Sequence, residues 1–174
     1  MQMISLVLTV IADDRPGLVE RLSSVIATHE GNWIESSMSR LAGAFAGIVR
    51  VEAEASRAAA LEADLAALAD DGIITTLKRG EASSERHGHP AHLAVICQDH
   101  PGIVHALSAM LAAKGVSITD LETEAYAGSM SGERMFRAEI DVVLPVDLEA
   151  GDLARALETL AGDMMAEIEF ADAV

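Results

Sequence analysis

The sequence predicts an α+β fold made of two ferredoxin-like repeats, each a four-stranded antiparallel sheet with both helices on one face. Two observations predict it. A loop motif returns 85 residues further along the chain. Each copy also alternates dense apolar runs, which are typical of strands, with apolar residues at helical spacing. Together they indicate the element order βαββαβ in each copy.

The repeat is visible in the loop motif and again near the end of each copy. Residues 14–19 (DRPGLV) return as residues 99–104 (DHPGIV). The leucines at positions 61, 65 and 68 return 92 positions later, so the second copy holds about seven additional residues. The stretch 127–133 is flexible in composition and has the right length to contain them.

The first half of copy one predicts a strand and a helix. Residues 3–12 form a dense β-branched run, the profile of a largely buried strand. Residues 16–30 carry apolar positions at helical spacing. Pro16 lies in the first turn of this helix, where its missing N–H costs nothing, and Gly31 ends it.

The second half of copy one predicts a hairpin, a helix and a last strand. Residues 33–41 and 45–53 are strand-like runs joined around Gly43. Residues 57–71 are rich in alanine and predict a helix, and residues 73–78 predict the last strand. The second copy repeats this order. Its expected elements are residues 92–98, 101–114, 116–125, 136–143, 152–160 and 167–171.

The segment between the copies has a different composition. Residues 79–91 hold almost no apolar side chains, two glycines and a proline, so they cannot build core. We therefore expect a first domain at residues 1–78, a flexible linker at 79–91 and a second domain at 92–174. A copy of about 80 residues is marginal alone. We expect the open face of its sheet to be covered by the sister repeat or by a second chain, which favours a homo-oligomer.

Composition and charge exclude several classes of function. Hydrophobic residues make up 51% of the chain, which excludes disorder, and no apolar run is long enough to predict a membrane span. Twelve basic against 28 acidic residues give a formal net charge of −16, which argues against direct binding to nucleic acid or an anionic membrane. The sequence starts without a secretion signal, and its single cysteine fits a reducing compartment, so we expect a cytoplasmic protein.

The repeated Asp-x-Pro-Gly motif marks the turn from the first strand into the first helix of each copy. Asp14 and Asp99 are predicted to accept backbone N–H bonds at the helix start, either as the cap or one residue before it. The motif therefore fits a purely structural turn. It equally fits a ligand site, because a helix N-terminus attracts carboxylates and glycine lets a ligand approach the backbone. Asn32 is predicted to add an amide donor and acceptor to the same pocket.

Three motifs carry a resemblance to a known family. Residues 14–19, residues 31–37 (GNWIESS) and residues 99–104 resemble ACT domains in tandem, most closely those of the glycine cleavage system transcriptional repressor type. The resemblance covers nearly the whole chain except the linker. It implies a regulatory module without a DNA-binding domain, which binds a small ligand, commonly an amino acid, where two ACT domains meet.

The resemblance also implies which residues contact the ligand, because the strand-to-helix loop and the start of the second strand supply the contacts in such modules. Copy two has Ser117 where copy one has Asn32 and carries a longer central hairpin, so the two sites need not be equivalent. The implied contacts are Asp14, Arg15, Pro16, Gly17, Leu18 and Asn32 in copy one and Asp99, His100, Pro101 and Gly102 in copy two.

Several of these residues also fit ordinary structural roles. Arg15 can pair with a ligand carboxylate as a planar fork of donors or lie solvated on the surface. His100 can sense pH near neutrality, but a surface histidine is commoner. Cys97 fits a buried core position better than a catalytic nucleophile. The three histidines at 87, 89 and 92 lack a carboxylate or cysteine at metal-ligand spacing, so no metal or other cofactor is expected.

The sequence thus favours a non-enzymatic amino-acid sensor that controls gene expression through a partner protein. By resemblance, the genes are those of glycine cleavage, and the partner is a DNA-binding activator. Two alternatives stay open. One is an allosteric subunit that senses an amino acid for a metabolic enzyme, and the other is a small enzyme that uses Cys97 and His100.

Overall fold

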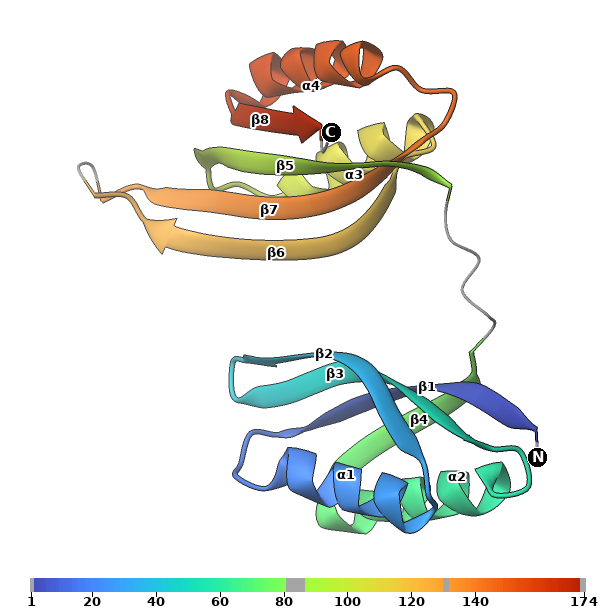
Figure 1. Cartoon of the computed structure of the whole chain (residues 1–174). Helices are drawn as coiled ribbons and strands as arrows, with labels where there is room; N and C mark the ends of the chain where they lie inside the picture. The colour runs from blue at the N-terminus through green and yellow to red at the C-terminus, as the bar shows by residue number, and fades with distance from the viewer. Residues whose placement is uncertain (1, 81–86, 130–131, 173–174) are drawn as a thin grey trace. The chain divides into compact units, whose positions relative to one another are not determined.

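The computed structural model describes residues 2–80, 87–129 and 132–172 of the chain (Figure 1). The chain divides into two units, Met1–Ser84 (unit 1) and Glu85–Val174 (unit 2). Each unit holds one antiparallel sheet of four strands, in the order β2-β3-β1-β4 in unit 1 and β6-β7-β5-β8 in unit 2. Two helices cover one face of each sheet (Figure 1). The predicted fold class is confirmed.

Unit 1 has the predicted order of elements. The inward positions of its first strand alternate strictly, with Leu6, Leu8 and Val10 buried, which is the pattern of a strand covered on one face. The second predicted helix ends in a short 3₁₀ turn, η1. The elements are β1 (Met3–Asp13), α1 (Leu18–Thr28), β2 (Asn32–Leu41), β3 (Ala44–Glu54), α2 (Ala58–Ala67), η1 (Leu68–Asp71) and β4 (Ile73–Arg79).

Unit 2 follows the same order, with one difference from the expected linker. Its first strand begins at Gly88 rather than at residue 92, because β7 is long enough to pair with residues 88–91 and Ala91 is buried in the core. Of the expected linker 79–91, residues 81–86 lie outside the described residues. The elements are β5 (Gly88–Gln98), α3 (Ile103–Ala113), β6 (Ser117–Ala127), β7 (Arg134–Pro145), α4 (Ala150–Met164) and β8 (Glu167–Asp172).

The two sheets share the same shift in strand register. The register of β2 on β3 shifts between Trp33 and Glu35, and that of β6 on β7 shifts at the equivalent place, between Ile118 and Asp120. The hairpins differ in length: Leu41 pairs with Ala44, whereas its counterpart Tyr126 pairs with Met135. This longer hairpin accounts for most of the additional residues expected in copy two, although residues 130–131 lie outside the described part.

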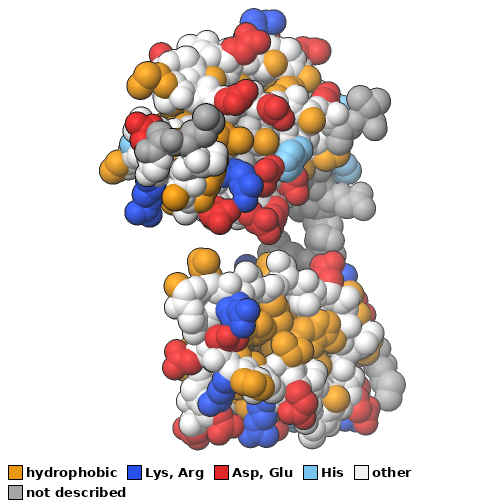
Figure 2. All heavy atoms as spheres, turned by 90° about the vertical axis from the view of Figure 1, so that its left-hand side faces the viewer, with side chains coloured by type: hydrophobic (Ala, Val, Ile, Leu, Met, Phe, Trp, Pro, Cys, Tyr) orange, Lys and Arg blue, Asp and Glu red, His pale blue; other side chains and the backbone are white. Residues whose placement is uncertain are grey.

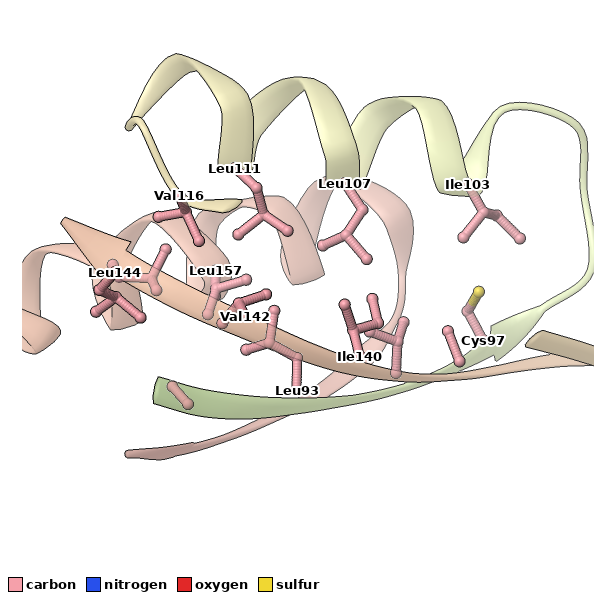
Figure 3. Close-up of a cluster of buried hydrophobic side chains, with 14 of the residues drawn as sticks. Leu93, Cys97, Ile103, Leu107, Leu111, Val116, Ile140, Val142, Leu144 and Leu157 are labelled. Atoms are coloured by element: carbon pink, nitrogen blue, oxygen red, sulfur yellow. The ribbon is translucent and has the colours of Figure 1, made fainter. Parts of the chain in front are cut away.

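Each unit has its own hydrophobic core between its helices and its sheet. In Figure 3, Leu107 and Leu111 of α3 point toward Leu93 and Ile140 of the sheet, and the sulfur of Cys97 lies in the same layer. Equivalent positions fill the core of unit 1, since Leu8 and Leu93 are both 0% exposed. Within the described residues, no helix is long and apolar enough to span a membrane.

The sheet faces away from the helices differ between the units. In unit 1 this face carries Ile11, Ile48 and Ile74, each about half exposed. It also has a hollow of about 350 Å³, which is lined by Arg50, and the guanidinium of Arg50 pairs with Glu35 at 2.8 Å. Figure 2 shows hydrophobic side chains gathered in a patch on unit 1, while acidic side chains are spread over the visible surface of unit 2.

The open face of the unit 2 sheet is acidic. Glu122 pairs across the sheet with Glu139, and Asp120 with Asp141. The two ring nitrogens of His92 lie 2.7 Å from Asp141 Oδ1 and 2.8 Å from Glu139 Oε2. These hydrogen bonds, first to Asp141 and then to Glu139, raise the pKa of His92 above its ordinary value of 6.5.

Candidate functional site

The two Asp-x-Pro-Gly loops have the same backbone. We call residues 14–17 corner 1 and residues 99–102 corner 2. Each ends in a glycine with positive φ, 89° at Gly17 and 95° at Gly102, and the helix begins at the next residue. A Cβ added to either glycine would meet nothing within 4 Å, so the backbone conformation, not crowding, requires glycine there. Both corners are therefore open to an approaching ligand.

The aspartates of the corners do not cap the helices, contrary to the prediction. The N–H of Asp14 donates to the carbonyl of Gly43 at 2.9 Å, and that of Asp99 to the carbonyl of Arg134 at 2.8 Å. Each corner thus extends the pairing with the hairpin by one residue. The carboxylates accordingly pair with arginines of the hairpin, Arg40 with Asp14 at 3.1 Å and Arg134 with Asp99 at 2.8 Å. In the described residues, neither α1 nor α3 has a side-chain N-cap.

Corner 1 borders a hollow that contains two arginines. Arg15 donates a hydrogen bond from its guanidinium to the backbone carbonyl of Asp71. Arg21, one turn into α1, donates to the carboxylate of the same residue, with Nη2 2.9 Å and Nε 3.3 Å from Asp71 Oδ2. The hollow has a volume of about 290 Å³. It is lined by Arg15, Pro16, Gly17, Leu18, Glu20, Arg21, Asp71 and Ile73, and we call it the arginine hollow.

Corner 2 lacks both arginines. His100 stands at the position of Arg15, and its Nδ1 lies 3.1 Å from the carbonyl oxygen of Pro101. Ala106 stands at the position of Arg21. The counterpart of Asp71 is Asp163, which lies within α4 rather than in a 3₁₀ turn. The two corners therefore share a backbone but not a charge distribution, and only corner 1 can offer a carboxylate two guanidinium groups.

Asn32 lies at the far end of unit 1 from corner 1. It begins β2 after α1 has run the length of the sheet, and it pairs with Glu52, which in turn faces Ser5. Corner 1 follows Asp13, eight residues along the same strand, a separation of roughly 25 Å at the rise of a β-strand. The prediction that Asn32 adds its amide to the pocket of its own copy is thus wrong, and the same placement holds for Ser117 in unit 2.

Comparison with known protein families identifies the fold of the unit that contains the arginine hollow. Residues 5–76 match the family model of the ACT domain. Unit 1 is an ACT domain. Unit 2 repeats its topology strand for strand, so the chain has a tandem ACT fold.

Two of the similar solved structures each cover 99% of this chain. A structure named "an Unknown Protein from Galdieria sulphuraria" has 29% sequence identity and a TM-score of 0.88, covering 99% of this chain and 100% of that one. A structure named "putative glycine cleavage system transcriptional repressor" has 18% identity and a TM-score of 0.75, covering 99% of each chain. At that identity, the second likeness shows the shared fold. No protein of curated function matches the sequence.

The remaining candidates of the sequence have structural environments in the ACT units. Cys97 is buried in the core of unit 2, as predicted (Figure 3). Burial, and secondly the charge of Asp99, raise the pKa of its thiol, so the nucleophilic thiolate is disfavoured. Within the described ranges, no group of three or more His, Cys, Asp or Glu side chains is placed to hold a metal ion.

Sequence reasoning missed four lining residues of the arginine hollow, Glu20, Arg21, Asp71 and Ile73. Arg21 was detectable, because it lies four positions after Gly17 and so shares the end of the helix with the corner. Asp71 is 50 residues further along the chain, and only the folded unit brings the end of η1 beside α1. Local sequence carries no signal for that contact.

Proposed function

We propose that this protein is a non-enzymatic regulator whose ACT unit 1 binds an α-amino acid at the arginine hollow. The observation that carries the proposal is the pair of guanidinium groups beside an open glycine corner, in a domain of a regulatory family. Guanidinium groups bind carboxylates with two parallel hydrogen bonds, and the start of α1 adds a favourable dipole.

The other walls of the hollow fit the rest of an amino acid. Glu20 lines it and supplies a carboxylate for the ammonium group of the ligand. Pro16, Leu18 and Ile73 supply apolar surface for a small side chain. The hollow of about 290 Å³ is lined by two guanidinium groups and by the carboxylates of Glu20 and Asp71, a pattern that suits a small zwitterion better than a simple anion.

We further propose that a second ACT unit completes the site. Asn32 is too far from corner 1 of its own unit, so its amide contributes to a pocket only where another unit lies against it. A homo-oligomer of this chain supplies such a unit. Ligand binding then favours the arrangement of units in which the pocket is complete, which is how a small molecule shifts an equilibrium between two assemblies.

The proposed output is control of gene expression through a protein partner. The likeness to the structure named after the glycine cleavage repressor supports glycine as the first ligand to test. The net charge of −16 opposes direct contact with DNA, so the signal passes through another protein. We expect no specific operator binding by the protein alone; a salt-sensitive, sequence-specific gel shift would contradict this. Co-purification with a metabolic enzyme instead of a transcription activator would favour the allosteric-subunit alternative.

A thermal-shift scan against the twenty amino acids tests the proposal. A ligand at 100 times its Kd adds roughly 2.7 kcal/mol of stability, which for a unit of fewer than 100 residues raises the midpoint by roughly 10 °C or more. Unit 1 can be followed selectively, because the single tryptophan of the chain is Trp33. We expect a rise with one or a few amino acids, lost in Gly17→Val and weakened in Asn32→Ala. No rise with any of them would contradict the proposal.

A further inference from the structure

Asp71 contacts both arginines of the arginine hollow, Arg15 and Arg21. Its carboxylate pairs with Arg21, and its backbone carbonyl accepts from Arg15. It is the last residue of η1, and Gly72, with φ 77°, turns the chain into β4 directly after it. The short turn thus holds one carboxylate at the rim of the hollow, against the guanidinium that a ligand carboxylate would use.

We propose that Asp71 is an internal competitor of the ligand: its carboxylate stands in for the carboxylate of the amino acid and leaves Arg21 when the ligand binds. This rests on the proposed function, because it assumes that an amino acid enters the arginine hollow.

The ion pair is weak enough to exchange. Both side chains are exposed to solvent, 56% for Arg21 and 49% for Asp71. Exposed pairs of this kind shift an equilibrium by a factor of about five at most. The pair therefore lowers ligand affinity by a modest factor and does not block the site.

Competition with Asp71 also makes the site prefer α-amino acids to simple carboxylate ions. Asp71 replaces only the carboxylate of a ligand, whereas an α-amino acid adds an ammonium group that Glu20 can accept and a backbone approach at Gly17. A plain carboxylate such as acetate competes with Asp71 without these additional contacts. The site therefore selects zwitterions over simple carboxylate ions.

Isothermal titration calorimetry on the full chain tests the inference, with glycine first and the other amino acids in turn, and acetate as the plain-carboxylate probe. Asp71→Asn removes the carboxylate charge but keeps the backbone carbonyl that holds Arg15. Asp70→Asn is the matched control, since it makes the same charge change one residue away. Asp163→Asn is the control at the equivalent position of unit 2.

We expect Asp71→Asn to bind the same amino acid about twofold to fivefold more tightly than the wild type, and to bind acetate less weakly than the wild type does. Both controls should stay within the error of the wild-type Kd. Equal or weaker amino-acid binding in Asp71→Asn would overturn the competitor role and leave the proposed function intact. No binding of any amino acid to the wild type or to Asp71→Asn would overturn both.

A second readout does not depend on the variant. The ¹³Cγ resonance of Asp71 should move in step with saturation as the amino acid is added, because its partner Arg21 is lost. The resonance of Asp70 serves as the reference. A ligand that saturates the protein while the Asp71 resonance stays fixed would overturn the exchange.

Discussion

Corner 1 and corner 2 have the same backbone and different side chains. Both end in a glycine with positive φ, both bond to the hairpin through the N–H of their aspartate, and both pair that aspartate with an arginine. They differ where a ligand would lie, because Arg15 and Arg21 of unit 1 are replaced by His100 and Ala106. The shared part builds the turn, and the unshared part decides which unit can bind a carboxylate.

The open sheet faces also differ between the units. That of unit 1 exposes isoleucines, and that of unit 2 exposes carboxylates gathered around His92. Two copies of one fold therefore present an apolar surface and an acidic surface. We interpret unit 1 as the sensing unit and unit 2 as a partner-facing unit.

The largest expected effects come from the cores, and they test whether the two units can be compared as separate bodies. Leu8→Ala and Leu93→Ala remove equivalent, fully buried side chains, and each should cost its own unit about 2–5 kcal/mol. In urea unfolding followed by Trp33 fluorescence, the transition of unit 1 should move in Leu8→Ala and stay in place in Leu93→Ala. Equal movement in both variants would mean that the units unfold as one.

The next effect tests the shared backbone of the corners. Gly17→Val and Gly102→Val each place a β-branched residue at a positive φ and should cost about 1–3 kcal/mol. The two losses of stability should be similar when measured by chemical denaturation. Amino-acid binding should be lost only in Gly17→Val. Loss of binding in Gly102→Val alone would assign the site to the other corner.

A smaller effect tests the side chains that distinguish the arginine hollow of unit 1 from the equivalent region of unit 2. Arg21→Gln removes one guanidinium from the hollow and should weaken amino-acid binding about fivefold, or about 1 kcal/mol. Its midpoint of unfolding should hardly change, because the pair with Asp71 is exposed. Arg155→Gln, on the surface of unit 2, is the control for the lost charge. Similar weakening in both variants would point to a general charge effect and contradict a specific site.

The smallest effect belongs to His92 on the acidic face. Its pKa is raised in the folded protein, so it stabilises unit 2 fully below pH 6.5 and loses that contribution as the pH rises through the raised value. The difference in thermal midpoint between the wild type and His92→Gln should thus be larger at pH 5.5 than at pH 8.5. His89→Gln controls for removal of a neighbouring histidine. A difference that grows with rising pH would contradict the assigned interaction with Asp141 and Glu139.

Local sequence sufficed for the fold and for half of the site. Apolar spacing predicted the repeat and the element order, because each element buries one periodic face. Glycine predicted the corners, since positive φ is a local requirement. Local sequence failed for the contacts of Asp14 and Asp99, because an aspartate before a helix can either cap the helix or pair with another partner. The extended backbone pairing with the hairpin places both carboxylates beside arginines instead. Arg21 and Asp71 meet only through tertiary folding.

The stoichiometry of amino-acid binding tests the central contrast most directly. Isothermal titration calorimetry of the full chain with the amino acid found in the thermal scan counts the sites per chain. We expect one site per chain, lost when Arg15 and Arg21 are both replaced by glutamine and kept in His100→Gln. Two equivalent sites per chain, or one site that survives the double replacement, would contradict it.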